Sequence, residues 1–202
     1  MSDYYITILK SVDCYKVKIV VKTSECEEII KKSRFIGIIS PCQSEREALL
    51  LIRNLHEQHP NASHIVYAYR IQSPDGLSCR FYDAGEPSGT AGKPIFQHLE
   101  GKQLINLVVV IIRYFGGIKL GAGGLTRAYS HVAKQAIETA EIVDYIKMAK
   151  LTLNLEYNQL QMLDYQLKKL GGEIVKQEFA EQVRTEIKIP EKNLDALIAV
   201  IK

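Results

Sequence analysis

Residues 107–127, with the sequence LVVVIIRYFGGIKLGAGGLTR, join a continuous apolar run to a glycine-rich basic turn. The apolar run, 107–112, has no polar position, so it predicts a strand that is buried on both faces. After the turn, apolar residues recur at helical spacing as far as Ala140, which predicts a long amphipathic helix. A buried strand that leads through glycines into a helix therefore forms the centre of the predicted fold.

The turn itself, 113–127, combines the features of an anion-binding site. Glycine permits positive φ and close approach of a ligand, and a helix start offers unpaired N–H groups with a partial positive charge. Residues 101–135 carry five Lys or Arg and no Asp or Glu, whereas the whole chain has 26 basic and 23 acidic residues and a net charge of +3. Because the positive charge is local, the pattern favours a local anion such as phosphate. Packing alone is the alternative explanation for the turn.

Hydrophobic periodicity and the positions of Pro and Gly divide the rest of the first part of the chain. They predict strands at 15–21, 34–40 and 64–71, a helix at 44–59 that begins with a capping box, and a short helix at 94–99. The polar stretch 72–93 is predicted to be one long loop, of a kind that is often functional. The long helix to Ala140 completes this part.

The pattern then restarts, which predicts a second domain. It indicates a strand at 151–155, a helix closed by Gly171 and Gly172, a hairpin of 173–179 with 183–189, and a helix at 190–201. This βαββα order is that of a ferredoxin-like unit without its final strand. We therefore expect an α+β protein with domains at 1–142 and 147–202.

Composition narrows the class of protein. The chain is 47% hydrophobic and 24% charged, as soluble globular proteins are. No apolar run approaches the roughly 20 residues that span a bilayer, and the first ten residues lack the basic start of a signal peptide. The four cysteines are scattered without a CxxC pair, which favours reduced thiols over disulfides or a zinc site. We expect a cytoplasmic protein with no membrane partner, metal or cofactor.

Three segments together resemble the YigZ/IMPACT family: KKSRFI at 31–36, GEPSGTAGKP at 85–94, and the turn at 113–127. The likeness covers residues 15–142, and the remainder looks like the small C-terminal domain of the bacterial branch. The resemblance implies an N-terminal domain like domain 2 of ribosomal protein S5, with helices on one face of a sheet. It also implies a cytoplasmic location and a link to translation, because eukaryotic members bind a ribosome-associated activator of a translation-regulating kinase and restrain that kinase.

The first functional hypothesis is thus a regulatory factor that binds RNA or the ribosome through a basic, glycine-rich anion site. Tyr114 and Phe115 would either stack on unpaired bases or pack in the core. At Gly117 and Gly123 we expect positive φ or a close approach. No catalytic or metal-binding residue is assigned, and the predicted anion site consists of Lys32, Arg34, Arg70, Glu86, Ser88, Thr90, Lys93, Arg113, Gly116, Gly117, Lys119, Gly121, Gly123, Gly124 and Arg127.

Two other hypotheses belong to different classes. A phosphate-handling enzyme distantly like the GHMP kinases would use Glu86 or Asp83 to hold Mg²⁺. The turn, however, matches neither a Walker A loop nor a dinucleotide-binding fingerprint, and Ala84 stands where many family members carry a second acid. The favoured role of Glu86 is an ion pair with Arg113 or Arg127. A regulatory protein partner on the second domain is the third hypothesis, and the oligomeric state is left open.

Overall fold

The computed structural model describes residues 17–73 and 76–201. The chain divides into two compact units between Tyr145 and Ile146. Within the described residues this division falls close to the predicted limits of 142 and 147, and the part of the predictions that concerns residues 1–16 lies outside them. Each unit mixes helices with an antiparallel sheet, so the predicted α+β class is confirmed.

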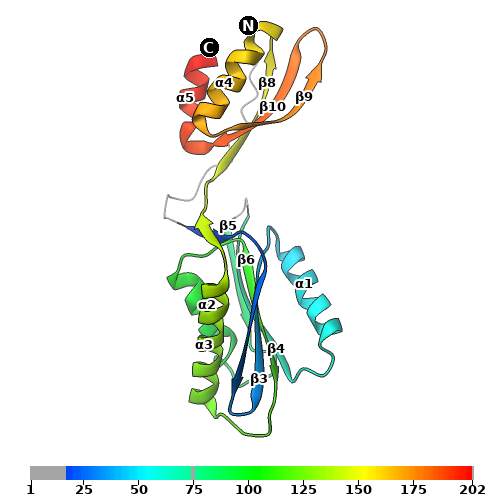
Figure 1. Ribbon diagram of the computed structural model, residues 1–202, viewed down its shortest axis with the longest axis vertical. Coiled ribbons are helices and arrows are strands. Elements are labelled where there is room, and N and C mark those ends of the chain that lie inside the picture. Colours follow the sequence, from blue (N-terminus) through cyan, green and yellow to red (C-terminus); the bar gives the residue numbers. More distant parts are fainter. Residues whose placement is uncertain (1–16, 74–75, 202) are drawn as a thin grey trace. The chain divides into compact units, whose positions relative to one another are not determined.

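The N-terminal unit is built on a five-stranded antiparallel sheet with β6 in the middle (Figure 1). Residues 107–112 of β6 are fully buried, because helices cover both faces of the strand. This burial explains why the run has no polar position. In spatial order the strands are β2 (Ser24–Ile30), β3 (Ser33–Pro41), β6 (Leu107–Tyr114), β4 (His64–Ser73) and β5 (Gly76–Tyr82).

Helices lie on both faces of this sheet, so the expectation of helices on one face is wrong. Helices α2 (Gly92–Gly101) and α3 (Ala122–Thr139) pack on the face that includes Val109. Helix α1 (Glu45–Gln58) packs on the other face, against Val110 and its neighbours. Figure 1 shows the sheet between α1 on one side and α2 with α3 on the other. The alternation of side chains along β6 therefore supplies two separate hydrophobic cores.

Two strands of the main sheet were not predicted. β2 carries three glutamates in seven residues, a composition that disfavours strands, yet it pairs with β3 along its whole length. β5 lies inside the stretch predicted as a loop and pairs with β4 in a hairpin. Both are edge strands among the described residues, and an edge strand with one solvated side has a weak hydrophobic signal.

A short two-stranded sheet closes the N-terminal unit. β1 (Lys18–Val20) pairs with β7 (Ile142–Asp144), the segment that follows α3. β1 falls within the strand predicted at 15–21, of which the first two residues lie outside the described part. This pairing brings the start and the end of the N-terminal unit together, so that unit extends beyond the end of α3.

The C-terminal unit has the ferredoxin-like order predicted for it. Its three-stranded sheet has the order β8-β10-β9, and α4 and α5 form a single core with it. Gly171, with φ of 69°, ends α4 in the left-handed region as expected for a C-terminal glycine. The elements are β8 (Met148–Leu155), η1 (Tyr157–Gln159), α4 (Leu160–Leu170), β9 (Glu173–Phe179), β10 (Val183–Pro190), η2 (Glu191–Asn193) and α5 (Leu194–Ile201).

Candidate anion-binding site

The glycine turn lies between the end of β6 and the start of α3. Gly121 forms the N-cap of α3 with φ of 72° and provides no capping side chain. The first turn of the helix contains no acidic residue, so the positive end of its dipole is not neutralised from within the helix. Lys119 and Arg127 flank this end and are both exposed. The helix start therefore offers N–H groups and two cationic side chains to solvent.

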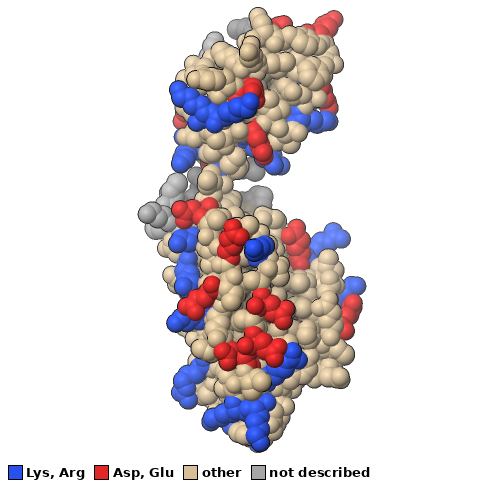
Figure 2. Space-filling view, in the orientation of Figure 1, with Lys and Arg blue, Asp and Glu red and all other residues tan. Residues whose placement is uncertain are grey.

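A second basic segment lies against the turn. Lys31 and Lys32 form the two-residue connection of the β2–β3 hairpin, and both side chains are exposed. A Cβ atom on Gly116 would lie 1.9 Å from the carbonyl oxygen of Lys32, so only glycine fits at this crossing. The buried Ser33 hydroxyl also accepts a hydrogen bond from the N–H of Gly116 at 3.3 Å. Lys and Arg side chains gather at the lower end of the N-terminal unit in Figure 2.

The hairpin connection is strained. Lys31 and Lys32 have φ of 46° and 65°, values that suit Asn and Gly far better than Lys. A non-glycine residue in this region costs free energy, and such strain is commonly retained where the side chain has a function. Lys31 was absent from the predicted site. Lys31 lies beside Lys32 in the turn that connects β2 with β3. Because β2 was not predicted, the turn was not predicted either.

The loop between β5 and α2 is closed by its own aspartate. The Asp83 carboxylate accepts hydrogen bonds from the N–H groups of Gly89, Ala91 and Gly92 at 2.8, 3.0 and 2.8 Å. The last two of these groups belong to the start of α2, so the carboxylate caps that helix from outside it. Asp83 therefore performs a structural role, which the sequence did not reveal.

Glu86 from the same loop is buried and joined to two other elements. Its Oε1 accepts hydrogen bonds from Arg113 Nη1 at 2.6 Å and from the Tyr129 hydroxyl at 2.7 Å. The pKa of the Tyr129 hydroxyl is raised far above its usual value, chiefly by burial and also by the Glu86 charge. Tyr129 thus stays protonated and donates to Glu86. The predicted pairing of Glu86 with Arg113 is correct, and it fastens the loop to β6 and α3.

His64 supports the same loop. Its Nδ1 lies 2.9 Å from the carbonyl oxygen of Ala84, and its Nε2 lies 3.8 Å from Glu86 Oε1. The first contact requires a proton on Nδ1, because a carbonyl oxygen only accepts hydrogen bonds. His64 begins β4 directly opposite Arg113 of β6, so the strand register places the ring beside the carboxylate.

Three of the predicted basic residues are engaged within the protein. Arg113 is 4% exposed and holds Glu86, so it does not face solvent as a phosphate ligand would. Arg70 donates to the carbonyl oxygens of Leu99 and Leu104. Arg34 is exposed but donates through two nitrogens to Glu27. Lys32, Lys93, Lys119 and Arg127 are exposed, and no ion pair recorded among the described residues involves them.

The predicted polar and glycine residues differ in what they do. Thr90 is buried and its hydroxyl donates to the Pro87 carbonyl, whereas Ser88 is exposed.

The glycines of the turn also differ from one another. Gly117 has φ of 85°, as expected. At Gly123 φ is not positive, and an added Cβ would meet only the end of the Arg127 side chain at 3.6 Å, so no contact among the described residues requires glycine there. Close approach of a ligand to Gly123 stays a prediction. A Cβ atom added to Gly124 would lie 3.0 Å from the Cβ atom of Leu120.

The two aromatic residues that end β6 also differ. The Tyr114 hydroxyl lies 2.8 Å from His59 Nδ1, and the Arg34 guanidinium lies over its ring. Phe115, by contrast, is 48% exposed. Its backbone N–H donates to the Ser63 hydroxyl at 3.0 Å, a contact that fixes the chain at this point. Tyr114 is therefore used internally, and Phe115 presents its side chain at the surface.

Other kinds of site find little support among the described residues. No group of three or more His, Cys, Asp or Glu side chains is arranged to hold a metal ion in 17–73 and 76–201. Over the same residues, no helix combines the length and the apolar character needed to cross a membrane. Cys26, Cys42 and Cys79 are free thiols, of which Cys79 is exposed.

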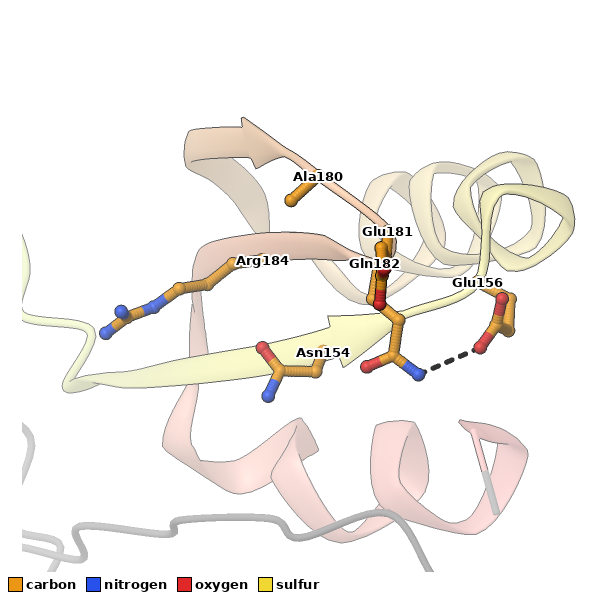
Figure 3. Close-up of a pocket in the computed structure, with 6 residues that line it drawn as sticks. All are labelled: Asn154, Glu156, Ala180, Glu181, Gln182 and Arg184. Atoms are coloured by element: carbon orange, nitrogen blue, oxygen red, sulfur yellow. Dashed lines mark hydrogen bonds between the residues drawn. The ribbon is translucent and has the colours of Figure 1, made fainter.

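The C-terminal unit has an open hollow near the turn that joins β9 and β10 (Figure 3). Arg184 and Glu156 extend to opposite sides of it in this view, and Gln182 donates to Glu156 at 2.9 Å. The lining has two acids and one base, so it lacks the positive charge expected of an anion site. Its residues are Asn154, Glu156, Ala180, Glu181, Gln182 and Arg184, none of them a predicted site residue.

Both units match known sequence families. The Impact N-terminal domain matches residues 31–137, and a domain of unknown function, DUF1949, matches residues 153–201. An IMPACT family member of Haemophilus influenzae is 37% identical over 171 residues, covering 84% of this chain and 83% of the relative. The IMPACT family member YvyE of Bacillus subtilis is 36% identical over 175 residues, covering 87% and 80%.

The similarity extends to three dimensions. A crystal structure described as that of a hypothetical protein superposes with a TM-score of 0.68 at 31% identity. The match covers 92% of this chain and 90% of the other, so it includes both units.

Proposed function

The chain belongs to the IMPACT family, and from that premise we propose that it is a regulatory factor linked to translation. It binds RNA or the ribosome through a basic surface formed by Lys31, Lys32, Lys119, Arg127 and the start of α3. We call this surface the basic end. A cytoplasmic location and a regulatory protein partner follow from the family resemblance and form part of the same proposal.

One observation carries the proposal: the open start of α3 adjoins a second, strained basic turn. Gly116 and Ser33 hold the two segments together, so cations from separate parts of the chain share one surface. Lysines in a left-handed turn are costly to folding, which argues that their charge is used. A phosphodiester backbone suits several exposed cations next to backbone N–H groups.

Lys93 and Ser88 extend the proposed surface toward the loop that precedes α2. Both are exposed, and they lie on either side of the Asp83-capped segment. Arg70 and Arg113 are left out of it because their guanidinium groups serve internal acceptors. Arg34 is left out because it is paired with Glu27. The predicted set is thereby reduced to exposed cations without an ion pair among the described residues.

The alternative phosphate-handling enzyme loses its metal ligands in this geometry. Asp83 accepts three backbone hydrogen bonds, and Glu86 holds a buried Arg and a buried Tyr. The geometry therefore favours binding over phosphoryl transfer.

The test is sedimentation with ribosomes, together with titration of single-stranded RNA at several salt concentrations. With three phosphates neutralised, log affinity should fall with log salt at a slope of about −2, given roughly 0.7 per contact. Lys119→Ala with Arg127→Ala should remove most of that slope and release the protein from ribosomes at moderate salt.

The matched control removes two charges elsewhere on the same unit. Lys22 and Arg53 have side chains that are 72% and 74% exposed and lie outside the basic end. Lys22→Ala with Arg53→Ala should leave binding unchanged. Equal losses in the two double variants would show general charge attraction, and no binding by the wild type at either salt would refute the proposal.

A further inference from the structure

Phe115 stands at the border of the basic end as a preorganised aromatic surface. It follows β6 directly and precedes Gly116, which lies against the Lys32 carbonyl. Its N–H is bound by Ser63, and the next N–H is bound by Ser33. Because the backbone is fixed on both sides, little freedom remains to be lost when a ligand contacts the ring.

The Arg113 guanidinium packs behind the ring. Its central carbon is 5.5 Å from the ring centroid of Phe115 and 5.5 Å from that of Phe35, so it contacts both rings. Glu86 compensates its charge from the side. One side of the Phe115 ring is thus supported from within, while 48% of the residue remains exposed.

We infer that the ligand of the basic end is single-stranded RNA and that Phe115 stacks on one of its unpaired bases. This inference rests on the proposed function and specifies its ligand. A base that stacks on the exposed side of Phe115 leaves the Arg113 guanidinium in contact with the other side of the ring. Duplex bases are already stacked on each other, so an unpaired base is what this ring selects. The exposed Ile118 in the same turn adds a second apolar contact.

The experiment compares an oligouridylate with an abasic strand of equal length and charge. Phe115→Ala and Phe115→Leu should each weaken oligouridylate binding about tenfold, the order of one lost base stack. Leu keeps an apolar contact with Arg113 but has no flat face, so it separates stacking from folding. Neither variant should change the salt slope or the affinity for the abasic strand.

Tryptophan fluorescence reads out stacking directly, because the natural chain contains no tryptophan and an introduced one would be the sole source of the signal. Phe115→Trp should bind oligouridylate as well as the wild type, and its fluorescence should be quenched by that strand and not by the abasic one. Phe81→Ala serves as control, because Phe81 is 44% exposed in the same unit but packs beside Phe96; it should bind normally.

The outcomes separate the two proposals. Salt-dependent binding that is equal for both strands and unaffected by Phe115→Leu overturns the stacking inference and leaves the proposed function intact. Binding of neither strand by a wild type that still sediments with ribosomes overturns the inference alone, and absence of binding to ribosomes as well overturns both.

Discussion

The N-terminal unit contains two glycine-rich segments that each lead into a helix, and they are completed in opposite ways. The segment before α2 is closed by its own carboxylates: Asp83 caps the helix and Glu86 is buried against Arg113. The segment before α3 has no capping side chain and no acid, and is surrounded by lysine and arginine. The same local chemistry thus gives a structural clamp in one place and an open site in the other.

The difference shows that a helix start becomes a binding site only when the protein leaves it unfilled. Both starts provide N–H groups and a positive dipole end. At α2 the carboxylate of Asp83 occupies them, whereas no side chain caps the start of α3. The position of acidic residues in the preceding loop, more than the glycines, decides between the two.

The largest effect should come from removing the buried carboxylate of the closed segment. Glu86→Ala leaves Arg113 buried without its partner, and breaking a buried ion pair in this way costs about 3–5 kcal/mol. The free energy of unfolding of the N-terminal unit, measured in urea, should fall by that order. Glu86→Gln keeps an acceptor oxygen and should cost less.

Glu27→Ala is the matched surface control. It removes a carboxylate that is likewise paired with an arginine, here through two nitrogens of Arg34, but this pair is exposed. A loss of stability as large as that of Glu86→Ala would mean that burial of the Glu86 pair is not what holds the loop.

A smaller effect is expected from opening the closed helix start. Asp83→Ala removes the carboxylate that caps α2 and should cost about 2 kcal/mol, the upper end of what loss of a helix cap costs. It also leaves the start of α2 without an anion, so sulfate should stabilise this variant more than it stabilises the wild type. Thermal unfolding in sodium sulfate and in sodium chloride of equal ionic strength measures both effects.

Asp83→Asn provides the intermediate case, because it keeps one acceptor oxygen without the charge. Its melting temperature should lie between those of the wild type and of Asp83→Ala. If sulfate stabilised all three proteins equally, the carboxylate would not be acting as an internal anion, and the contrast with α3 would not hold.

Much of the centre of the fold could be predicted because its signals are local. The apolar run of β6 and the helical spacing of α3 depend on neighbouring residues, and both elements lie where they were expected. The edge strands β2 and β5 were missed, because their pairing depends on β3 and β4 rather than on their own composition. Helix α1 was predicted from its spacing and its capping box, but its place on the second face of the sheet was not, because the likeness to a known fold implied one covered face.

The site shows the same division. A pairing of Glu86 with Arg113 or Arg127 was predicted, since the acids of the 72–93 stretch are opposite in charge to the basic turn, and the partner is Arg113. The capping role of Asp83 was not predicted, because it depends on how the loop folds. The close approach of Lys32 to Gly116 was not predicted either, because it joins segments more than 80 residues apart. Arg70 was expected at the site but serves two backbone carbonyls, a tertiary contact without a sequence signal.

The smallest effect tests the open helix start and should have opposite signs in two assays. Gly123 is helical, and the nearest atom to an added Cβ is Arg127 Nη1 at 3.6 Å. Alanine is favoured over glycine inside a helix by up to about 1 kcal/mol, so Gly123→Ala should raise the melting temperature slightly. The same methyl group lies beside the N–H groups of the first turn and should weaken RNA binding several-fold.

Gly101→Ala is the control that gives this prediction its meaning. Gly101 ends α2, and nothing lies within 4 Å of an added Cβ, so alanine should be tolerated there as well. It is remote from the start of α3 and should leave RNA binding unchanged. If Gly123→Ala also bound RNA normally, phosphate would not approach the backbone at α3, and binding would rest on the basic side chains alone. A stability gain with weakened binding at Gly123, and no change in binding at Gly101, would instead mean that this helix start is kept free of side chains for its ligand.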